Sequence, residues 1–213
     1  MKVNEIFYSI QGEGTEIGRP TVFLRLFACD LRCSWCDSMY AVEGTDFRDL
    51  SNEEIIKKIK EYNCRNICIT GGEPLIQRKE LVPLAEELIS DGYFIVLETS
   101  GHKKPPELFN GSSCLISMDC KCPSSGMEKR MDFELFEQLG TKDQLKFVLK
   151  DSADYKYAKN ILKTYKINCP IIFQTVYGEN ITWLADSVLQ DNLNSVRVLP
   201  QLHKFLWGEK RGV

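Results

Sequence analysis

Three cysteines within eight residues have the spacing of ligands to a metal cluster. Cys29, Cys33 and Cys36 form a CxxxCxxC motif that directly follows the apolar, β-branched run at 21–27. Each iron of a cubane iron–sulfur cluster takes one thiolate ligand. Three thiolates from one loop therefore leave the fourth iron of a [4Fe–4S] cluster open to a molecule that is not protein. An open metal position is typical of a catalytic site rather than a structural one.

Other uses of the cysteines fit the sequence less well. A structural zinc site needs four protein ligands, usually from two paired motifs, and the chain has no second CxxC pair. Disulfides are disfavoured because the nine cysteines are odd in number and no apolar signal segment opens the chain. A redox pair of Cys33 and Cys36 would leave Cys29 without a role. We therefore expect a reducing, cytoplasmic setting.

Composition limits the class of partner. The 213 residues are 43% hydrophobic, which predicts a single compact domain over residues 1–213. The formal net charge of −3 is made of mixed signs and predicts no nucleic-acid partner. No apolar run approaches the length that spans a bilayer, so no membrane partner is expected.

Apolar runs alternate with helical patterns along the chain, which predicts parallel βα units. Because the chain is shorter than a full eightfold barrel, we expect a partial, open βα barrel of about six parallel strands. The strand-like runs lie at 21–27, 66–70, 93–98, 114–118, 144–149, 171–176 and 195–199. The helical patterns lie at 53–61, where Ser51 and Glu54 form a capping box, and at 77–90, 132–139, 153–163 and 182–190.

Polar residues gather where the predicted strands end, which in barrels is the edge that carries the site. Gly71-Gly72-Glu73-Pro74 follows the second of these strands. Paired glycines allow close approach of a ligand to the backbone, and the carboxylate of Glu73 could accept hydrogen bonds from an amino group. Alone, the motif is better explained as an ordinary strand-to-helix turn.

Arg25 interrupts the first strand-like run. Alternation places its side chain opposite Leu24 and Leu26, inside the predicted barrel. A buried arginine needs an anion. Both an anionic ligand and an internal salt bridge satisfy this requirement.

The cysteine motif and the GGEP motif together resemble the radical S-adenosylmethionine (SAM) enzymes. The resemblance implies that SAM binds the open iron and is cleaved by one electron from the cluster to a 5′-deoxyadenosyl radical, which abstracts hydrogen from substrate. It also implies SAM contacts from Trp35, Gly71, Gly72 and Glu73, and from a group of residues on the rim: Glu98, Ser100, Asp119, Lys121 and Gln174.

The segment from Tyr8 to Thr15, which reads YSIQGEGT, and the later QLHK at 201–204 resemble the 7-carboxy-7-deazaguanine synthases over nearly the whole chain. This resemblance implies conversion of 6-carboxy-5,6,7,8-tetrahydropterin to 7-carboxy-7-deazaguanine with loss of ammonia. It further implies a flavodoxin- or ferredoxin-type reductant, a homodimer, a Mg²⁺ ion bound by Ser38, and a C-terminal tail that closes over substrate. The implied substrate contacts are Ile10, Gln11, Gly12, Glu13, Arg25, Thr70 and His203.

Several alternatives stay open on the sequence. Glycyl-radical-enzyme activating enzymes are also short and carry CxxxCxxC, and a non-catalytic iron–sulfur electron carrier would use the same cysteines. Cys120 and Cys122 suggest an auxiliary cluster, although a CxC pair lacks enough ligands. The segment 119–126 also departs from the shorter one common in the family, which puts local cofactor contacts and the electron-donor surface in question.

Overall fold

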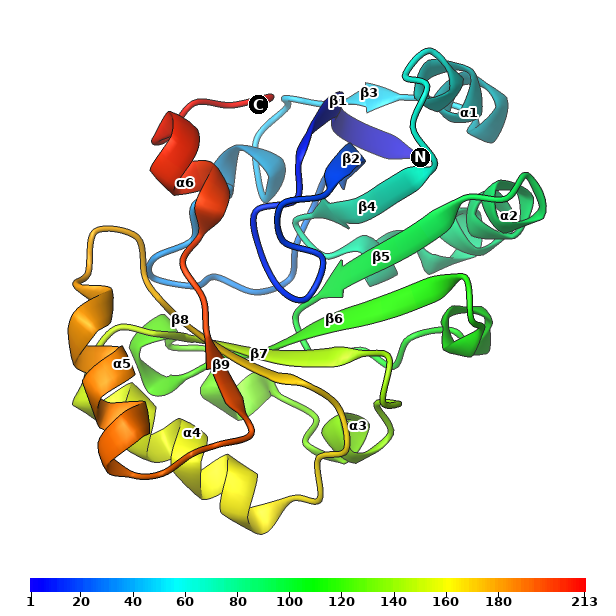
Figure 1. Cartoon of the computed structure of the whole chain (residues 1–213). Coiled ribbons are helices and arrows are strands. Elements are labelled where there is room, and N and C mark those ends of the chain that lie inside the picture. Colours follow the sequence, from blue (N-terminus) through cyan, green and yellow to red (C-terminus); the bar gives the residue numbers. More distant parts are fainter.

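The computed structural model describes all 213 residues, and its framework is a single nine-stranded sheet in the order β3-β1-β2-β4-β5-β6-β7-β8-β9. Seven neighbouring strands run parallel, and β1 and β3 join one side antiparallel. The strands at the two edges, β3 and β9, do not pair with each other, so the barrel is open (Figure 1). The strands are β1 Lys2–Ile10, β2 Pro20–Leu26, β3 Arg48–Asp49, β4 Asn66–Gly71, β5 Phe94–Thr99, β6 Cys114–Cys120, β7 Gln144–Leu149, β8 Ile171–Thr175 and β9 Val196–Val198.

The predicted partial βα barrel is confirmed, with seven parallel strands where about six were expected and with β1 and β3 added at one side. β9 lies within the last predicted run, at 195–199, and is the seventh parallel strand beside β2 and β4–β8. β1 was not predicted as a strand, because its sequence KVNEIFYSI mixes charged and apolar residues. It pairs with β2 over most of its length, from Val3 opposite Leu26 to Ile10 opposite Pro20.

The helices follow the predicted order. The capping box of α1 forms in both directions, with Glu54 N donating to Ser51 Oγ and Ser51 N donating to Glu54 Oε2. Helix α3 is shorter than the predicted 132–139, and α6 was not predicted. The helices are α1 Asn52–Lys60, α2 Arg78–Ser90, α3 Glu134–Glu137, α4 Ser152–Thr164, α5 Ile181–Gln190 and α6 Leu202–Trp207. None of them is both long and apolar enough to cross a bilayer.

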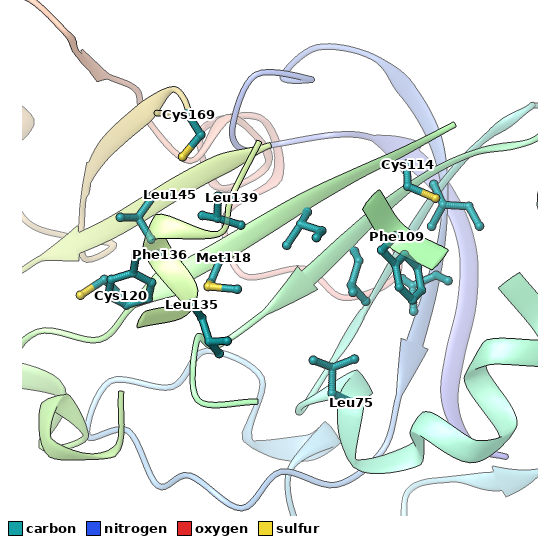
Figure 2. Close-up of a cluster of buried hydrophobic side chains, with 14 of the residues drawn as sticks. Leu75, Phe109, Cys114, Met118, Cys120, Leu135, Phe136, Leu139, Leu145 and Cys169 are labelled. Carbon is teal, nitrogen blue, oxygen red and sulfur yellow. The ribbon is translucent and has the colours of Figure 1, made fainter. Parts of the chain in front are cut away.

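The main core lies between the outer face of the sheet and the elements that cover it. Figure 2 shows part of it, where Leu135 and Phe136 lie near Met118 of β6 and Phe109 lies near Cys114. Cys114 and Cys120 are buried in the same core as small apolar side chains.

The inner face of the sheet has two layers. The lower layer is apolar and contains Cys68, Val96 and Leu115, packed against Phe23. Two residues further along their strands, alternation brings charged side chains to the same face, including Arg25 of β2 and Glu98 of β5. Phe23 and Cys68 of the apolar layer line one cavity together with these charged side chains.

Candidate active site

A cavity of about 460 Å³ opens at the carboxyl ends of the parallel strands. It is lined by the three motif cysteines, by the segment 10–13 and by residues near the C-terminus, including His203 and Val213. Every predicted site residue except Glu73 and Gln174 lines this cavity. The tertiary structure therefore brings segments that are 200 residues apart to one site.

The cysteine loop forms one wall of the cavity. The chain leaves β2 through Ala28, whose φ of 84° is in the left-handed region, and the next residue is Cys29. All three motif cysteines are half-buried. No three Cys, His, Asp or Glu side chains converge as ligands to a single ion would. Three separated thiols around one cavity fit a cubane, in which each thiolate binds a different iron.

The segment 119–126, where the chain departs from the expected pattern, supports the cysteine loop. Ser34 N donates to the Ser125 carbonyl at 3.0 Å, and Trp35 Nε1 donates to Ser124 Oγ at 3.0 Å. Ser124 N in turn donates to the buried carboxylate of Asp154 at 2.9 Å. These bonds fix the loop between Cys33 and Cys36 from outside the cavity.

Glu73 of the GGEP motif is fully buried and does not reach the cavity. Its carboxylate accepts hydrogen bonds from Leu75 N, Thr99 Oγ1, Ser100 N and Ser100 Oγ. Four donors satisfy a carboxylate. In this structure Glu73 therefore holds Ser100, which does line the cavity, and the predicted contact of its side chain with SAM stays a prediction.

The glycines of the motif allow backbone to approach backbone. Gly71 has a φ of +139°, and a Cβ there would lie 2.0 Å from the carbonyl oxygen of Leu26. A Cβ at Gly72 would lie 2.2 Å from the carbonyl oxygen of Ala28. The two glycines thus bring the end of β4 against the start of the cysteine loop.

We expect Gly71→Ala to destabilise the protein by more than about 3 kcal/mol, because the clash involves paired backbone that cannot move aside. Gly92→Ala is the matched control: its φ is also positive, at +81°, but nothing lies within 4 Å of the added Cβ. Thermal unfolding of the two variants checks the difference. Equal losses in Tm would show that backbone conformation alone, and not the close approach, requires glycine at position 71.

Arg25 forms the internal salt bridge that the sequence left open, and it also lines the cavity. Its Nε donates to Glu5 Oε1 at 2.7 Å, across the β1–β2 pair. The guanidinium also lies over the rings of Phe7 and Tyr40. The hydrogen bond to Glu5 uses only Nε, and Arg25 lines the cavity, so an anion in the cavity could still bind its terminal amino groups.

The C-terminal segment closes onto the segment 10–13. Leu202 N donates to the Gly12 carbonyl at 2.9 Å, and Gln201 Nε2 donates to Glu13 Oε1 at 2.9 Å. A Cβ at Gly12 would lie 2.1 Å from His203 Nδ1, so only glycine at position 12 admits the imidazole this closely. Figure 1 shows the resulting path, in which α6 returns from β9 to the β1–β2 side of the sheet.

Lys146, on β7, is the central charged residue that the sequence reasoning missed. Its Nζ lies 2.7 Å from Glu13 Oε2, 2.7 Å from Glu98 Oε2 and 3.5 Å from Asp119 Oδ1, and its side chain is only 2% exposed. We call these four residues the Lys146 cluster. The sequence feature that could have identified Lys146 is the one that singled out Arg25, a cation within an apolar strand. Lys146 interrupts the strand QLKFVL.

Electrostatics in the Lys146 cluster favour an ionised lysine. Burial alone lowers the pKa of Lys146, but the carboxylates of Asp119, Glu13 and Glu98 outweigh burial and raise it well above its ordinary value. Burial also opposes ionisation of Glu13, yet Lys146 and His203 lower the pKa of Glu13 to about 2. Glu98 behaves oppositely, because burial and the neighbouring carboxylates raise its pKa. The cluster thus holds carboxylates with different tendencies to take up a proton.

Two further predictions concern buried residues. The amide nitrogen and oxygen of Gln174 are buried without a hydrogen-bond partner in the protein, next to Val148 in the β7–β8 pairing. Val148 lines the cavity but Gln174 does not. Cys120 and Cys122 are buried, and burial raises the pKa of each thiol. Their burial fits packing in the core better than ligation of a second cluster.

Comparison with known proteins places these features in context. Residues 25–110 match the Radical SAM superfamily. The chain is 36% identical to the 7-carboxy-7-deazaguanine synthase of Koribacter versatilis and 35% identical to that of Thermoplasma acidophilum, and each alignment covers 100% of both chains. The crystal structure of QueE from Escherichia coli is similar in fold, with a TM-score of 0.77 and 24% identity, covering 95% of this chain and 94% of that one.

Proposed function

The chain belongs to the 7-carboxy-7-deazaguanine synthase family, and from this premise we propose that it converts 6-carboxy-5,6,7,8-tetrahydropterin to 7-carboxy-7-deazaguanine with loss of ammonia. It is a radical SAM enzyme of deazapurine biosynthesis and uses SAM and a [4Fe–4S] cluster. The chain is similar to these synthases over its full length. This similarity favours the synthase assignment over a glycyl-radical activating enzyme or a simple electron carrier. We further propose that residues 1–213 act as one domain.

The observation that carries the proposal is a single cavity with two chemically different walls. One wall presents the three motif thiols and the paired glycines. The other presents amide, carboxylate and cationic groups from Gln11, Glu13 and Arg25. A pterin needs both donors and acceptors along its edge when it is buried, and a cation for its carboxylate.

When bound, the cluster and SAM supply a carbon radical that removes hydrogen from substrate. The protein holds the substrate in position for this reaction. Glu13 is held by Lys146 and Gln201 and offers acceptors to the pterin edge, while Arg25 offers donors to the substrate carboxylate. His203 and the C-terminal segment close the cavity and exclude water, which protects a radical from side reactions.

Three finer assignments belong to the same proposal. Mg²⁺ would bind at Ser38, whose hydroxyl lines the cavity 3.8 Å from Cys36 Sγ, with substrate oxygens and water completing the shell. The active form would be a homodimer, reduced by a flavodoxin or ferredoxin. A cytoplasmic setting, where thiols stay reduced, suits nine free cysteines.

One incubation tests the proposed activity. Anaerobically reconstituted protein is mixed with SAM, dithionite, Mg²⁺ and 6-carboxytetrahydropterin, and products are read by mass spectrometry. We expect 7-carboxy-7-deazaguanine and 5′-deoxyadenosine in step with substrate loss. Formation of 5′-deoxyadenosine without the deazaguanine would keep the radical chemistry and reject the substrate.

Arg25→Ala is expected to raise the KM for substrate about 10- to 100-fold, because charge-assisted hydrogen bonds contribute about 1.5–3 kcal/mol. Uncoupled cleavage of SAM should persist, since the guanidinium is held by Glu5 and provides no ligand to the cluster. Glu5→Gln is the control, because it removes the ion-pair partner of Arg25 but keeps the guanidinium. If Glu5→Gln impairs turnover as much as Arg25→Ala does, Arg25 acts through its salt bridge and not through substrate.

A further inference from the structure

His102 does not line the cavity, yet its imidazole contacts two segments that do. Its Nε2 lies 2.8 Å from Asp30 Oδ1, and its Nδ1 lies 3.0 Å from Ser100 Oγ. Asp30 directly follows the motif cysteine Cys29. Ser100 follows β5 and lines the cavity. The imidazole therefore bridges the cysteine loop and the end of β5.

A second path of hydrogen bonds connects the other chain neighbour of Cys29 to the same serine. Glu73 N donates to the Ala28 carbonyl at 2.8 Å. The carboxylate of Glu73 accepts from Ser100 N at 2.8 Å and from Ser100 Oγ at 2.5 Å. The two paths close a ring of contacts that starts and ends at Cys29. We call its members the Cys29 ring: Ala28, Glu73, Ser100, His102 and Asp30.

The His102 side of the ring is held as firmly as the Glu73 side. The His102 side chain is only 4% exposed, and because a carboxylate only accepts, its Nε2 carries the hydrogen of the bond to Asp30. Gly101, with a φ of +72°, turns the chain between Ser100 and His102, and a Cβ there would lie 2.6 Å from the Asp119 carbonyl oxygen. Buried hydrogen bonds are costly to leave unmade, so the ring resists separation of its members.

Such a ring matters where one ligand must meet two groups at once. SAM has to reach the open iron of a cluster that Cys29 holds, and it also has to fit the cavity wall that contains Ser100. Residues behind the direct ligands fix their orientation, and removing one typically costs 10- to 100-fold in affinity or activity. The contacts of His102 place it in that position.

We propose that His102 is a positioning residue, which holds Cys29 and Ser100 in the relative arrangement that SAM needs to bind the open iron. It acts through Asp30 and Ser100, since its own side chain lies outside the cavity. The inference rests on the cluster and SAM of the proposed function, but not on the identity of the substrate.

Three substitutions separate the two halves of the bridge. His102→Gln can place its amide near the position of Nε2 and keep the contact with Asp30. His102→Asn can place its amide near Nδ1 and keep the contact with Ser100, and His102→Ala keeps neither. Lys103→Ala is the matched control, because Lys103 also pairs with Asp30, at 3.0 Å, but is not a member of the Cys29 ring.

Binding of SAM is measured by equilibrium dialysis against the oxidised cluster, without pterin, so that no SAM is cleaved. We expect the Kd to rise about tenfold in His102→Ala and several-fold in His102→Asn and His102→Gln. The change that SAM causes in the EPR spectrum of the reduced cluster should weaken in the same order. Iron content should stay near that of wild type, because all three thiolates remain.

Amide hydrogen exchange of the apo-protein gives a measurement that needs neither cluster nor SAM. Exchange should be faster at Ser100 and over residues 28–33 in the His102 variants, and Lys103→Ala should match wild type in every measurement. If His102→Ala does not fold, the Asn and Gln variants carry the test, because each keeps one polar contact.

Unchanged affinity for SAM in the folded His102 variants would overturn the proposal. Full recovery by either His102→Asn or His102→Gln would also overturn it, because one contact would then suffice and no bridge would be needed. Loss of iron from all three variants would assign His102 to cluster assembly instead. Failure of the proposed function is separate, because wild-type enzyme would then bind SAM normally and form no deazaguanine.

Discussion

Lys146→Met is expected to destabilise the protein by about 3–5 kcal/mol, because it leaves the partly buried carboxylates of Glu13 and Glu98 without their cation. For a chain of this size, that loss lowers Tm by about 10 °C. Glu13 would also lose the contact that holds it toward the cavity, so turnover should fall below detection even at temperatures where the variant is folded. Calorimetry and the product assay measure the two effects.

The pH dependence of the Lys146→Met variant separates charge from packing. Removing the cation raises the folded-state pKa of Glu98 further above its unfolded value, in the direction already set by burial. Stability linked to a raised carboxyl pKa is present at low pH and lost as pH rises through the folded value. The gap in Tm between wild type and variant should therefore narrow on acidification.

Two control variants complete this experiment. Lys146→Arg keeps the positive charge and should recover most of the stability, and the exposed Lys163→Met should change little. A gap in Tm that is constant from neutral to acidic pH would contradict the electrostatic explanation.

Cys33→Ala is expected to abolish both the cluster and turnover. Two remaining thiolates hold a cubane too weakly, so iron content and visible absorbance after anaerobic reconstitution should fall to background. Cys64→Ala is the matched control, since Cys64 is also partly exposed but hydrogen-bonds to the Pro20 carbonyl, outside the cavity. Cleavage of SAM by the Cys33→Ala variant would refute the assignment of the three cysteines.

The type of a residue indicates what it could bind, but its surroundings in the folded protein show which groups it contacts. Glu73 has the chemistry to bind an amino group, yet four protein donors already surround its carboxylate. Lys146 was overlooked, although it satisfies the same criterion that singled out Arg25. A charged residue within an apolar strand is informative at every position, because burial of an unpaired charge is costly.

The sequence by itself determined the order of the parallel strands and of the helices between them, the cluster loop and the polar rim. These follow from local rules: alternation along strands, capping at Ser51, and the spacing of cysteines within one loop. Only the tertiary structure decided which charges meet. Glu13, Glu98, Asp119 and Lys146 come from four separate elements, and their pairing depends on strand register and on the path of the segment before β2. Contacts between distant segments are fixed by how the whole sheet curves and packs, and no local pattern in the chain encodes that geometry.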